Sequence, residues 1–129
     1  MNPPVRFCTA ALLAMWTAGA LAQGYPSKPM RIVVPFPAGG PTDIVTRLIA
    51  VKLTEIMGQQ AVVENRGGAN GLIGVDAVVK SAPDGYTMVM TTASPVAISP
   101  AVYPKMPFDT LRDLAPVTLA TTTPELLVV

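Results

Sequence analysis

Apolar and polar positions alternate along the chain in a way that predicts short strands followed by helices. Arg31–Val34 is a β-branched, apolar run typical of a buried strand, and Pro35 and Pro37 end it because proline cannot donate a ladder hydrogen bond. After a Gly-Gly turn, Pro41–Met57 carries apolar residues at helical spacing, and Gly58 is a suitable stop. We expect the apolar residues of this helix to face the core: Ile44, Val45, Leu48, Ile49, Leu53 and Ile56.

The same succession continues through the middle of the chain. Ala61–Val63 predicts a second strand, Leu72–Ser81 a second helix and Tyr86–Met90 a third strand, with a glycine-rich loop at Glu64–Gly71. Parallel strands need a crossover connection, which is usually a helix. The pattern therefore predicts an α/β fold with a mostly parallel sheet and flanking helices.

The last third of the chain is less regular. Ser99–Asp109 contains three prolines and cannot form a long helix, whereas Asp109–Leu114 is typical of one short helical turn. Pro116–Thr122 predicts a fourth strand. Glu125–Val129 begins another apolar run that stops at the last residue, so we expect the chain to be incomplete.

Residues 1–22 have the pattern of a secretory signal peptide. An apolar core at Phe7–Ala18 precedes Ala20–Ala22, a small-x-small cleavage site. A membrane anchor is the competing interpretation, but this core is well short of the ~20 residues needed to span a bilayer. Cys8 leaves with the leader, so the remaining chain has neither a disulfide framework nor a thiol nucleophile.

Charge and composition narrow the function classes. Nine basic and eight acidic residues give a net charge of +1, and Arg6 would be lost with the leader. A neutral chain lacks the basic field that nucleic acid or an anionic membrane requires. Histidine is absent, and no cluster of residues has the spacing of a metal site or a catalytic triad. We therefore expect no catalytic residue, no metal and no cofactor.

Three loops follow the three predicted strands: Phe36–Thr42, Asn65–Gly71 and Thr91–Ser94. Ligands of parallel α/β sheets bind at the carboxyl ends of the strands, so these loops are expected to meet at one edge. They are rich in glycine or hydroxyl groups and nearly uncharged, which favours binding through backbone N–H groups, hydroxyls and water. Pro41 and Asp43 mark a helix N-terminus, where an anion such as a carboxylate is stabilised.

The same loop residues also fit structural roles. The Gly-Gly turn is suited simply to connecting a strand to a helix. Asn65 and Asn70 are suited to turn or cap hydrogen bonds, and Arg66 to a solvated loop charge rather than a carboxylate clamp. The hydroxyls of the third loop are suited to capping a short helix at Pro95–Ile98. The residues alone leave both interpretations open.

Four ordered blocks give a resemblance that covers Tyr25–Val129. The blocks are Tyr25–Asp43 with the pattern Y-P-x-K-P-x-R-I-V-V-P-F-x-A-G-G-x-x-D, Val62–Gly71, Ala82–Thr87 and Leu114–Val117. Together they resemble the Bug/TctC-type family, the extracytoplasmic solute receptors of tripartite tricarboxylate transporters. Family members are two to three times as long as this chain, and proline is common where Gly67 stands.

The resemblance implies a periplasmic-binding-protein-like (type II) fold of two α/β domains that close over a small carboxylate. On this basis residues 1–22 are the signal peptide, 23–124 the N-terminal part of domain 1 and 125–129 the start of a crossover toward a second domain. It further implies a periplasmic location, delivery of the solute to the membrane components of the transporter, and a monomer when complete.

The resemblance also implies a ligand site. In similar receptors the loops after the first and third strands hold one carboxylate through backbone groups and bridging waters, with the second loop close by. Asp43 is expected to orient water and loop amides rather than to touch the anion. The implied ligand-binding residues are Phe36, Ala38, Gly39, Gly40, Thr42, Asp43, Asn65, Gly68, Thr91, Thr92, Ala93 and Ser94.

Two other classes of function remain open at this point. An exported α/β enzyme, or a fragment of one, would need a nucleophile and a base drawn from Asp, Glu, Lys, Ser or Thr. A truncated gene product without a function of its own is the other alternative. Among receptors, the sequence does not choose between tricarboxylates, dicarboxylates, acidic amino acids and aromatic carboxylates.

Overall fold

The computed structural model of the chain describes residues 24–122, and its centre is a small parallel sheet. Strands β1 (Met30–Val34), β2 (Ala61–Asn65) and β3 (Thr87–Val89) lie in the order β2-β1-β3, and both pairs are parallel. This confirms the predicted parallel α/β arrangement. The predicted signal peptide at 1–22 and the predicted crossover at 125–129 lie outside the described residues.

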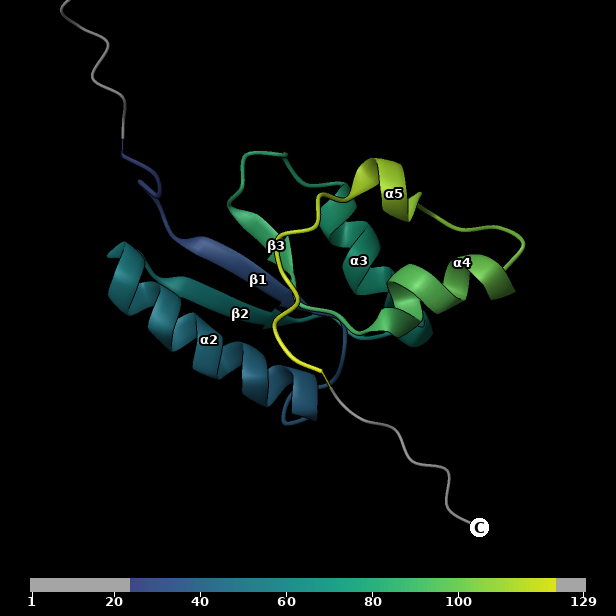
Figure 1. The fold of residues 1–129 in the computed structure, drawn as a ribbon, viewed down its shortest axis with the longest axis horizontal. Helices are drawn as coiled ribbons and strands as arrows, with labels where there is room; N and C mark the ends of the chain where they lie inside the picture. Colours follow the sequence, from purple (N-terminus) through teal and green to yellow (C-terminus); the bar gives the residue numbers. More distant parts are fainter. Residues whose placement is uncertain (1–23, 123–129) are drawn as a thin grey trace, which may run out of the picture.

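Helices connect the strands and cover the sheet. α2 (Pro41–Met57) leads from β1 to β2 and packs against both strands. A short 3-10 turn, η2 (Ala69–Gly71), and α3 (Leu72–Val79) lead from β2 to β3, and α3 contacts β1 and β3 (Figure 1). The first crossover runs from β1 to β2, and the second runs in the opposite direction from β2 over β1 to β3, so right-handed connections place the helices on opposite faces. Four of the five residues of β1 are accordingly buried.

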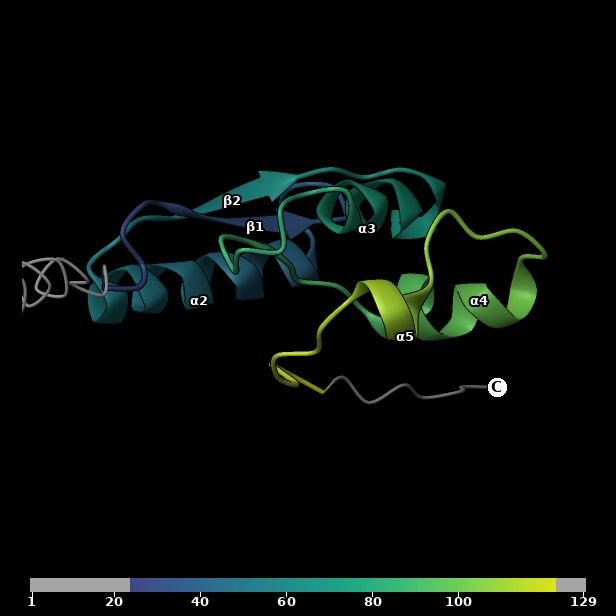
Figure 2. The same ribbon diagram turned by 90° about the horizontal axis from the view of Figure 1, so that it is seen from above.

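The chain after β3 continues beyond the carboxyl ends of the strands with short helical turns. A π-helical turn, η3 (Ser94–Ile98), runs into α4 (Ser99–Val102), and α5 (Thr110–Asp113) follows (Figure 1, Figure 2). The side chain of Asp109 caps α5 by accepting hydrogen bonds from two backbone N–H groups. Between residues 24 and 122, none of the helices has both the length and the apolar character to cross a bilayer.

The ends of α2 follow from its terminal residues, as predicted. Pro41 occupies the first turn, where a backbone N–H would have no acceptor within the helix, so the absence of an N–H in proline costs no hydrogen bond. Gly58 ends the helix at φ 67°, in the left-handed region, and its N–H donates to the carbonyl of Thr54 at 3.1 Å. The helix therefore begins at Pro41 and ends just before Gly58, as these two residues predict.

The predicted buried face of α2 is wrong. The buried residues are Asp43, Thr46 and Ala50, whereas Leu48 is 66% exposed and Ile56 79% exposed. The small side chains of Thr46 and Ala50 let the helix approach the sheet closely. The buried carboxylate of Asp43 accepts a hydrogen bond from the turn that precedes the helix. The apolar period of the helix therefore does not mark its sheet-facing side. Of the other residues predicted to be buried, Val45, Ile49 and Leu53 are half-buried and Ile44 is exposed.

The predicted fourth strand is also wrong. Residues 114–122 form no strand, and instead of running beside β3 this segment brings Thr121 next to Pro41 and Thr91 at the carboxyl end of the sheet. Two features disfavour pairing with β3. β3 is only three residues long, so it offers few backbone hydrogen bonds to a neighbour, and Pro116 has no N–H to donate. The second strand, by contrast, is two residues longer than predicted, because β1 pairs with β2 as far as Asn65.

A cluster at the amino end of the sheet ties the lead-in segment to the turn before β3. We call it the N-terminal clasp, and it consists of Tyr25, Ser27, Lys28, Asp84, Gly85 and Tyr86. The hydroxyl of Tyr25 donates to the carbonyl of Gly85, and the Ser27 N–H donates to the hydroxyl of Tyr86, both at 2.8 Å. Lys28 pairs with Asp84 at 3.0 Å. Its ammonium also lies 4.3 Å from the centre of the Tyr86 ring.

The clasp gives a structural role to two of the four sequence blocks on which the family resemblance rests. It takes Tyr25, Ser27 and Lys28 from the first block, and Asp84–Tyr86 from the third. These residues act at the end of the sheet opposite the strand-end loops.

Removal of the Tyr86 hydroxyl should weaken the clasp. Tyr86→Phe leaves the Ser27 N–H without its acceptor, so we expect the free energy of unfolding to fall by about 0.5–1.5 kcal/mol. Urea denaturation of the full-length mature protein measures this change. Tyr103→Phe is the matched control, because the hydroxyl of Tyr103 makes no hydrogen bond within residues 24–122 and its loss should change stability little. Equal stability of the two variants would contradict the role of the clasp.

Gly74 allows α3 to lie close to the end of β1. A Cβ there would lie 2.6 Å from the Arg66 carbonyl oxygen and 2.7 Å from the Cβ of Pro35. Gly74→Ala should therefore destabilise the protein by about 1–3 kcal/mol, although alanine favours a helix by about 1 kcal/mol. Gly67→Ala is the matched control, since its Cβ would meet nothing closer than 3.8 Å. A Gly74→Ala protein as stable as the control in urea denaturation would refute this packing argument.

Candidate functional site

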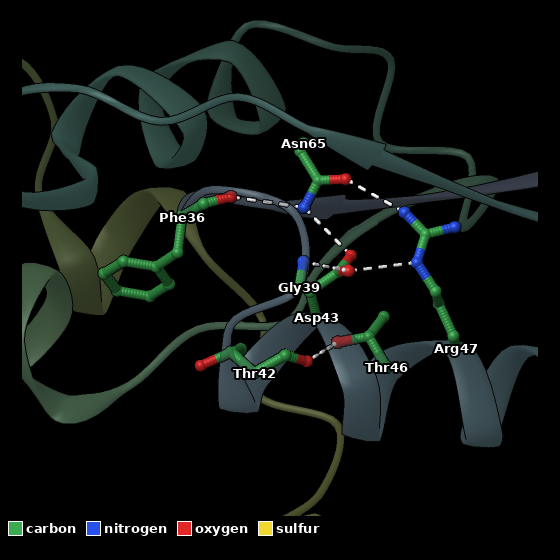
Figure 3. Close-up of polar contacts among 7 residues, drawn as sticks. All are labelled: Phe36, Gly39, Thr42, Asp43, Thr46, Arg47 and Asn65. Atoms are coloured by element: carbon green, nitrogen blue, oxygen red, sulfur yellow. Dashed lines mark hydrogen bonds and ion pairs between the residues drawn. The ribbon is translucent and has the colours of Figure 1, made fainter.

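The turn between β1 and α2 is held by the buried carboxylate of Asp43. Asp43 lies in the first turn of α2 and is 3% exposed. Its Oδ2 accepts a hydrogen bond from the Gly39 N–H at 2.8 Å and from Arg47 Nε at 3.0 Å (Figure 3). A buried carboxylate must be paired to be tolerated, and here its partners come from the turn and from the next turn of the helix.

Asn65, the last residue of β2, completes the network. Its Nδ2 donates to Asp43 Oδ1 at 2.9 Å and to the Phe36 carbonyl at 3.2 Å. Its Oδ1 accepts from Arg47 Nη2 at 3.1 Å. The ring of Phe36 points away from this network (Figure 3). We call Asp43, Arg47 and Asn65 the turn network, and it joins the helix, the strand and both ends of the Phe36–Gly39 turn.

The turn network lowers the pKa of Asp43. Hydrogen bonds from the Arg47 guanidinium, the Gly39 amide and the Asn65 amide bring this pKa from 3.8 to about 2, against the opposing effect of burial. The carboxylate is therefore ionised throughout the neutral and mildly acidic range, and its oxygens are already occupied by donors. This supports the expectation that Asp43 orients loop amides and does not itself hold an anion.

The first and third loops face each other across a small hollow. Pro41, Thr42, Val45, Met90, Thr91 and Thr121 line it, and its volume is about 90 Å³. We call this the strand-end hollow. Thr42 comes from the start of α2 and Thr91 follows β3, so two of the three predicted loops meet here. A typical small-molecule pocket has about 300–1,000 Å³, so these residues form only part of one.

Unused backbone donors lie along the same edge. Within residues 24–122, the N–H groups of Thr42 and Asp43 have no backbone acceptor, as expected for the first turn of a helix. The N–H groups of Thr92 and Ala93 have no backbone acceptor in the described range either. Ala38 and Gly39 are exposed beside them. An anion is suited to such donors, because the helix N-terminus also carries a partial positive charge.

The second loop joins this edge through one side-chain contact. Asn70 Nδ2 donates to Ser94 Oγ at 2.7 Å, linking the loop after β2 to the start of η3. Asn70 has φ 54°, in the left-handed region that asparagine tolerates. Gly68 precedes η2 with φ 127° and does not line the hollow; a Cβ there would lie 2.6 Å from Ile73 Cδ1 of α3. Gly40 is the N-cap of α2.

Two structural alternatives raised by the sequence can now be decided. No side-chain hydrogen bond caps η3, so the capping role for the hydroxyls of the third loop is wrong. Arg66 is an exposed loop charge, as expected, and it forms an ion pair with Glu64. The Arg66 guanidinium lowers the pKa of Glu64, with a smaller effect from Arg31.

Arg47 is a residue of the turn network that the sequence analysis missed. Its signal was present in the sequence, since an aspartate and an arginine four residues apart meet on one helix face. Its second contact, to Asn65, depends on β2 lying beside β1 and was not readable from local spacing. Within residues 24–122, no group of three or more Cys, Asp or Glu side chains is placed to hold a metal ion.

Solved structures with the same arrangement define the class of the protein. A structure described as a periplasmic transporter matches with a TM-score of 0.66 and 44% identity, over 69% of this chain and 30% of that one. MatC from Rhodopseudomonas palustris with bound malate matches with a TM-score of 0.66 and 35% identity, over 69% and 30%. R. palustris Rpa4515 with adipate matches with a TM-score of 0.65 and 40% identity, over 68% and 29%. The fold is thus that of part of a periplasmic binding protein.

Sequence comparison identifies the family. The family model described as the tripartite tricarboxylate transporter family receptor, TctC, matches residues 45–129. The BugT protein of Bordetella pertussis is 44% identical over 108 residues, which are 83% of this chain and 33% of BugT. The chain therefore belongs to the TctC receptor family, whose members are periplasmic solute-binding proteins. It spans about a third of the length of this relative.

Acid should weaken the protein partly through Asp43. Because the fold lowers the pKa of this carboxyl from 3.8 to about 2, its stabilising contribution is complete above about pH 4 and is lost as the pH falls toward 2. Asp43→Asn lacks this contribution. We expect the variant to be less stable at pH 7 but to lose less stability than the unmodified protein between pH 4 and pH 2.

Urea denaturation of the full-length mature protein at pH 7, 4 and 2 provides the measurement. Asp76→Asn is the matched control, since Asp76 forms an i,i+4 ion pair with Lys80 on the other helix. The control shows how much of any change follows from the loss of one i,i+4 ion pair. An identical loss of stability in acid for Asp43→Asn and the unmodified protein would contradict the role given to Asp43.

Proposed function

We propose that the protein is an extracytoplasmic receptor that captures a small carboxylate at the carboxyl edge of its sheet. The observation that carries the proposal is that the hydroxyl-bearing residues Thr42 and Thr91 line the strand-end hollow at the N-terminus of α2, next to backbone N–H groups that have no backbone acceptor within residues 24–122. Thr42 and Thr91 supply the hydroxyls. Both oxygens of the Asp43 carboxylate accept hydrogen bonds from Gly39 and Asn65, so Asp43 presents no free oxygen that would repel the ligand.

The ligands of similar proteins favour one class of acid. MatC holds malate and Rpa4515 holds adipate, and both are dicarboxylates. We propose a small dicarboxylate here too, with one carboxylate against the amides of the first and third loops. The ligand-binding residues predicted above are retained in this proposal, with Asn65 and Gly68 contributing to the shape of the second loop.

The strand-end hollow is too small to enclose a whole dicarboxylate. At about 90 Å³ it accommodates one end of a dicarboxylate and leaves the other end outside. This chain covers about 30% of the solved structures that it matches, and a second α/β domain is therefore proposed to close over the ligand. In this organisation residues 1–22 are the leader, 23–124 belong to the first domain, and 125–129 begin the crossover.

Family membership supports the remaining parts of the proposal. The receptor acts in the periplasm as a monomer and presents its ligand to the membrane components of a tripartite tricarboxylate-type transporter. It binds and releases its solute unchanged and is not an enzyme. No nucleophile with an adjacent base is required for this activity, and no metal or cofactor is proposed.

Thermal unfolding of the full-length mature protein tests the proposal. Malate, adipate and other dicarboxylates should raise the melting temperature, because a ligand at one hundred times its Kd stabilises the folded state by about 2.7 kcal/mol. Thr91→Val should weaken binding by about tenfold, as expected for one hydroxyl that hydrogen-bonds a charged group. Thr87→Val, in β3, is the matched control and should bind like the unmodified protein.

Two results would contradict the proposal. One is the absence of any shift with tricarboxylates, dicarboxylates, acidic amino acids and aromatic carboxylates. The other is turnover of one of these acids, which would favour the exported enzyme.

A further inference from the structure

The side chains of the turn network are directed at one another and at the backbone, away from the strand-end hollow. Asp43 receives donors on both carboxylate oxygens. The amide of Asn65 uses Nδ2 for two acceptors and Oδ1 for one donor. Arg47 is not among the residues that line the hollow. Asp43 and Asn65 therefore have no free donor or carboxylate oxygen for a ligand, and Arg47 lies outside the hollow.

Arg47 fixes which way the Asn65 amide points. Its Nε donates to Asp43 and its Nη2 to Asn65 Oδ1, so one guanidinium spans both residues. With the amide reversed, Asn65 Oδ1 would face the Asp43 carboxylate and the Phe36 carbonyl, and acceptors would oppose acceptors. The planar fork of arginine selects the orientation that satisfies every group.

The turn is anchored at both ends by this arrangement. The Phe36 carbonyl accepts from Asn65, and the Gly39 N–H donates to Asp43. Gly39 adopts φ 82°, a conformation that needs a defined turn around it. The Ala38 amide between these anchors and the amides of Thr42 and Asp43 at the start of α2 have no backbone acceptor within residues 24–122 and are those proposed to face the carboxylate.

We propose that Arg47 and Asn65 are positioning residues, which hold the Phe36–Gly40 turn in its binding conformation before the ligand arrives and do not touch the ligand. This inference rests on the proposed function and deepens it. A turn that is already ordered loses little freedom on binding, so the network contributes to affinity through preorganisation.

The Arg47→Lys variant distinguishes the positioning role of Arg47 from the effect of its positive charge and from its contribution to helix stability. Lysine keeps the positive charge and the i,i+4 pairing with Asp43, but a single ammonium does not reproduce the fork to Asn65. We expect dicarboxylate affinity, measured by calorimetry on the full-length mature protein, to fall at least about tenfold with a nearly unchanged melting temperature. Lys80→Met removes the comparable ion pair to Asp76 in α3 and should leave affinity unchanged.

Amide hydrogen exchange supplies a second readout without ligand. In Arg47→Lys the Gly39 amide should exchange about ten times faster than in the unmodified protein, whereas the amides of β1 should exchange at the same rate. A merely structural network would instead lower the melting temperature and raise exchange across α2 and β2 together.

The outcomes separate the two claims. Wild-type affinity and unchanged Gly39 exchange in Arg47→Lys would overturn the positioning role while leaving the proposed function intact. An affinity loss that accompanies a large drop in melting temperature would also overturn it. If the unmodified protein binds none of the acids, the proposed function fails, and Gly39 exchange alone decides whether Arg47 positions the turn.

Discussion

The burial of one carboxylate constrains the structure around the strand-end edge. An ionised group at 3% exposure is tolerated only with full hydrogen bonding, and Asp43 obtains its partners from the turn, from α2 and from β2. This requires β2 to extend as far as Asn65, in register with Val34 of β1. It also requires α2 to approach the sheet with small residues, as it does at Thr46 and Ala50. The conformation of the turn and the position of the helix therefore depend on the same interaction.

The sequence blocks that resemble the family form contacts at both ends of the sheet. At the amino end, the N-terminal clasp joins the lead-in segment to the turn before β3 through hydroxyl hydrogen bonds, an ion pair and the contact of two tilted rings, Tyr25 and Tyr86. At the carboxyl end, the turn network shapes an edge that presents backbone N–H groups and threonine hydroxyls. The first block contributes to both ends. An edge without free charged side chains is suited to an anion that keeps part of its hydration.

Local sequence chemistry predicted the elements well and their environment poorly. Proline and glycine set both ends of α2, and the alternation of strand and helix patterns gave the parallel sheet. The buried face of α2 was missed because its inward side carries Asp43, Thr46 and Ala50, while large aliphatic residues lie outside. The fourth strand was predicted wrongly because a strand needs a partner, which residues 114–122 do not have in the described structure. The loops that form the candidate site were predicted, but Arg47 was not, since its role depends on a tertiary contact to Asn65.

The central claim is that backbone amides at the carboxyl edge of the sheet receive one carboxylate of the ligand. Amide chemical shifts of the isotopically labelled full-length mature protein, followed during a dicarboxylate titration, test this directly. The account predicts large, saturable shifts at Thr42, Asp43, Thr92 and Ala93, whose N–H groups have no backbone acceptor within residues 24–122, and small ones at the N-terminal clasp. Saturable binding whose shifts lie elsewhere and leave these four amides unchanged would contradict it.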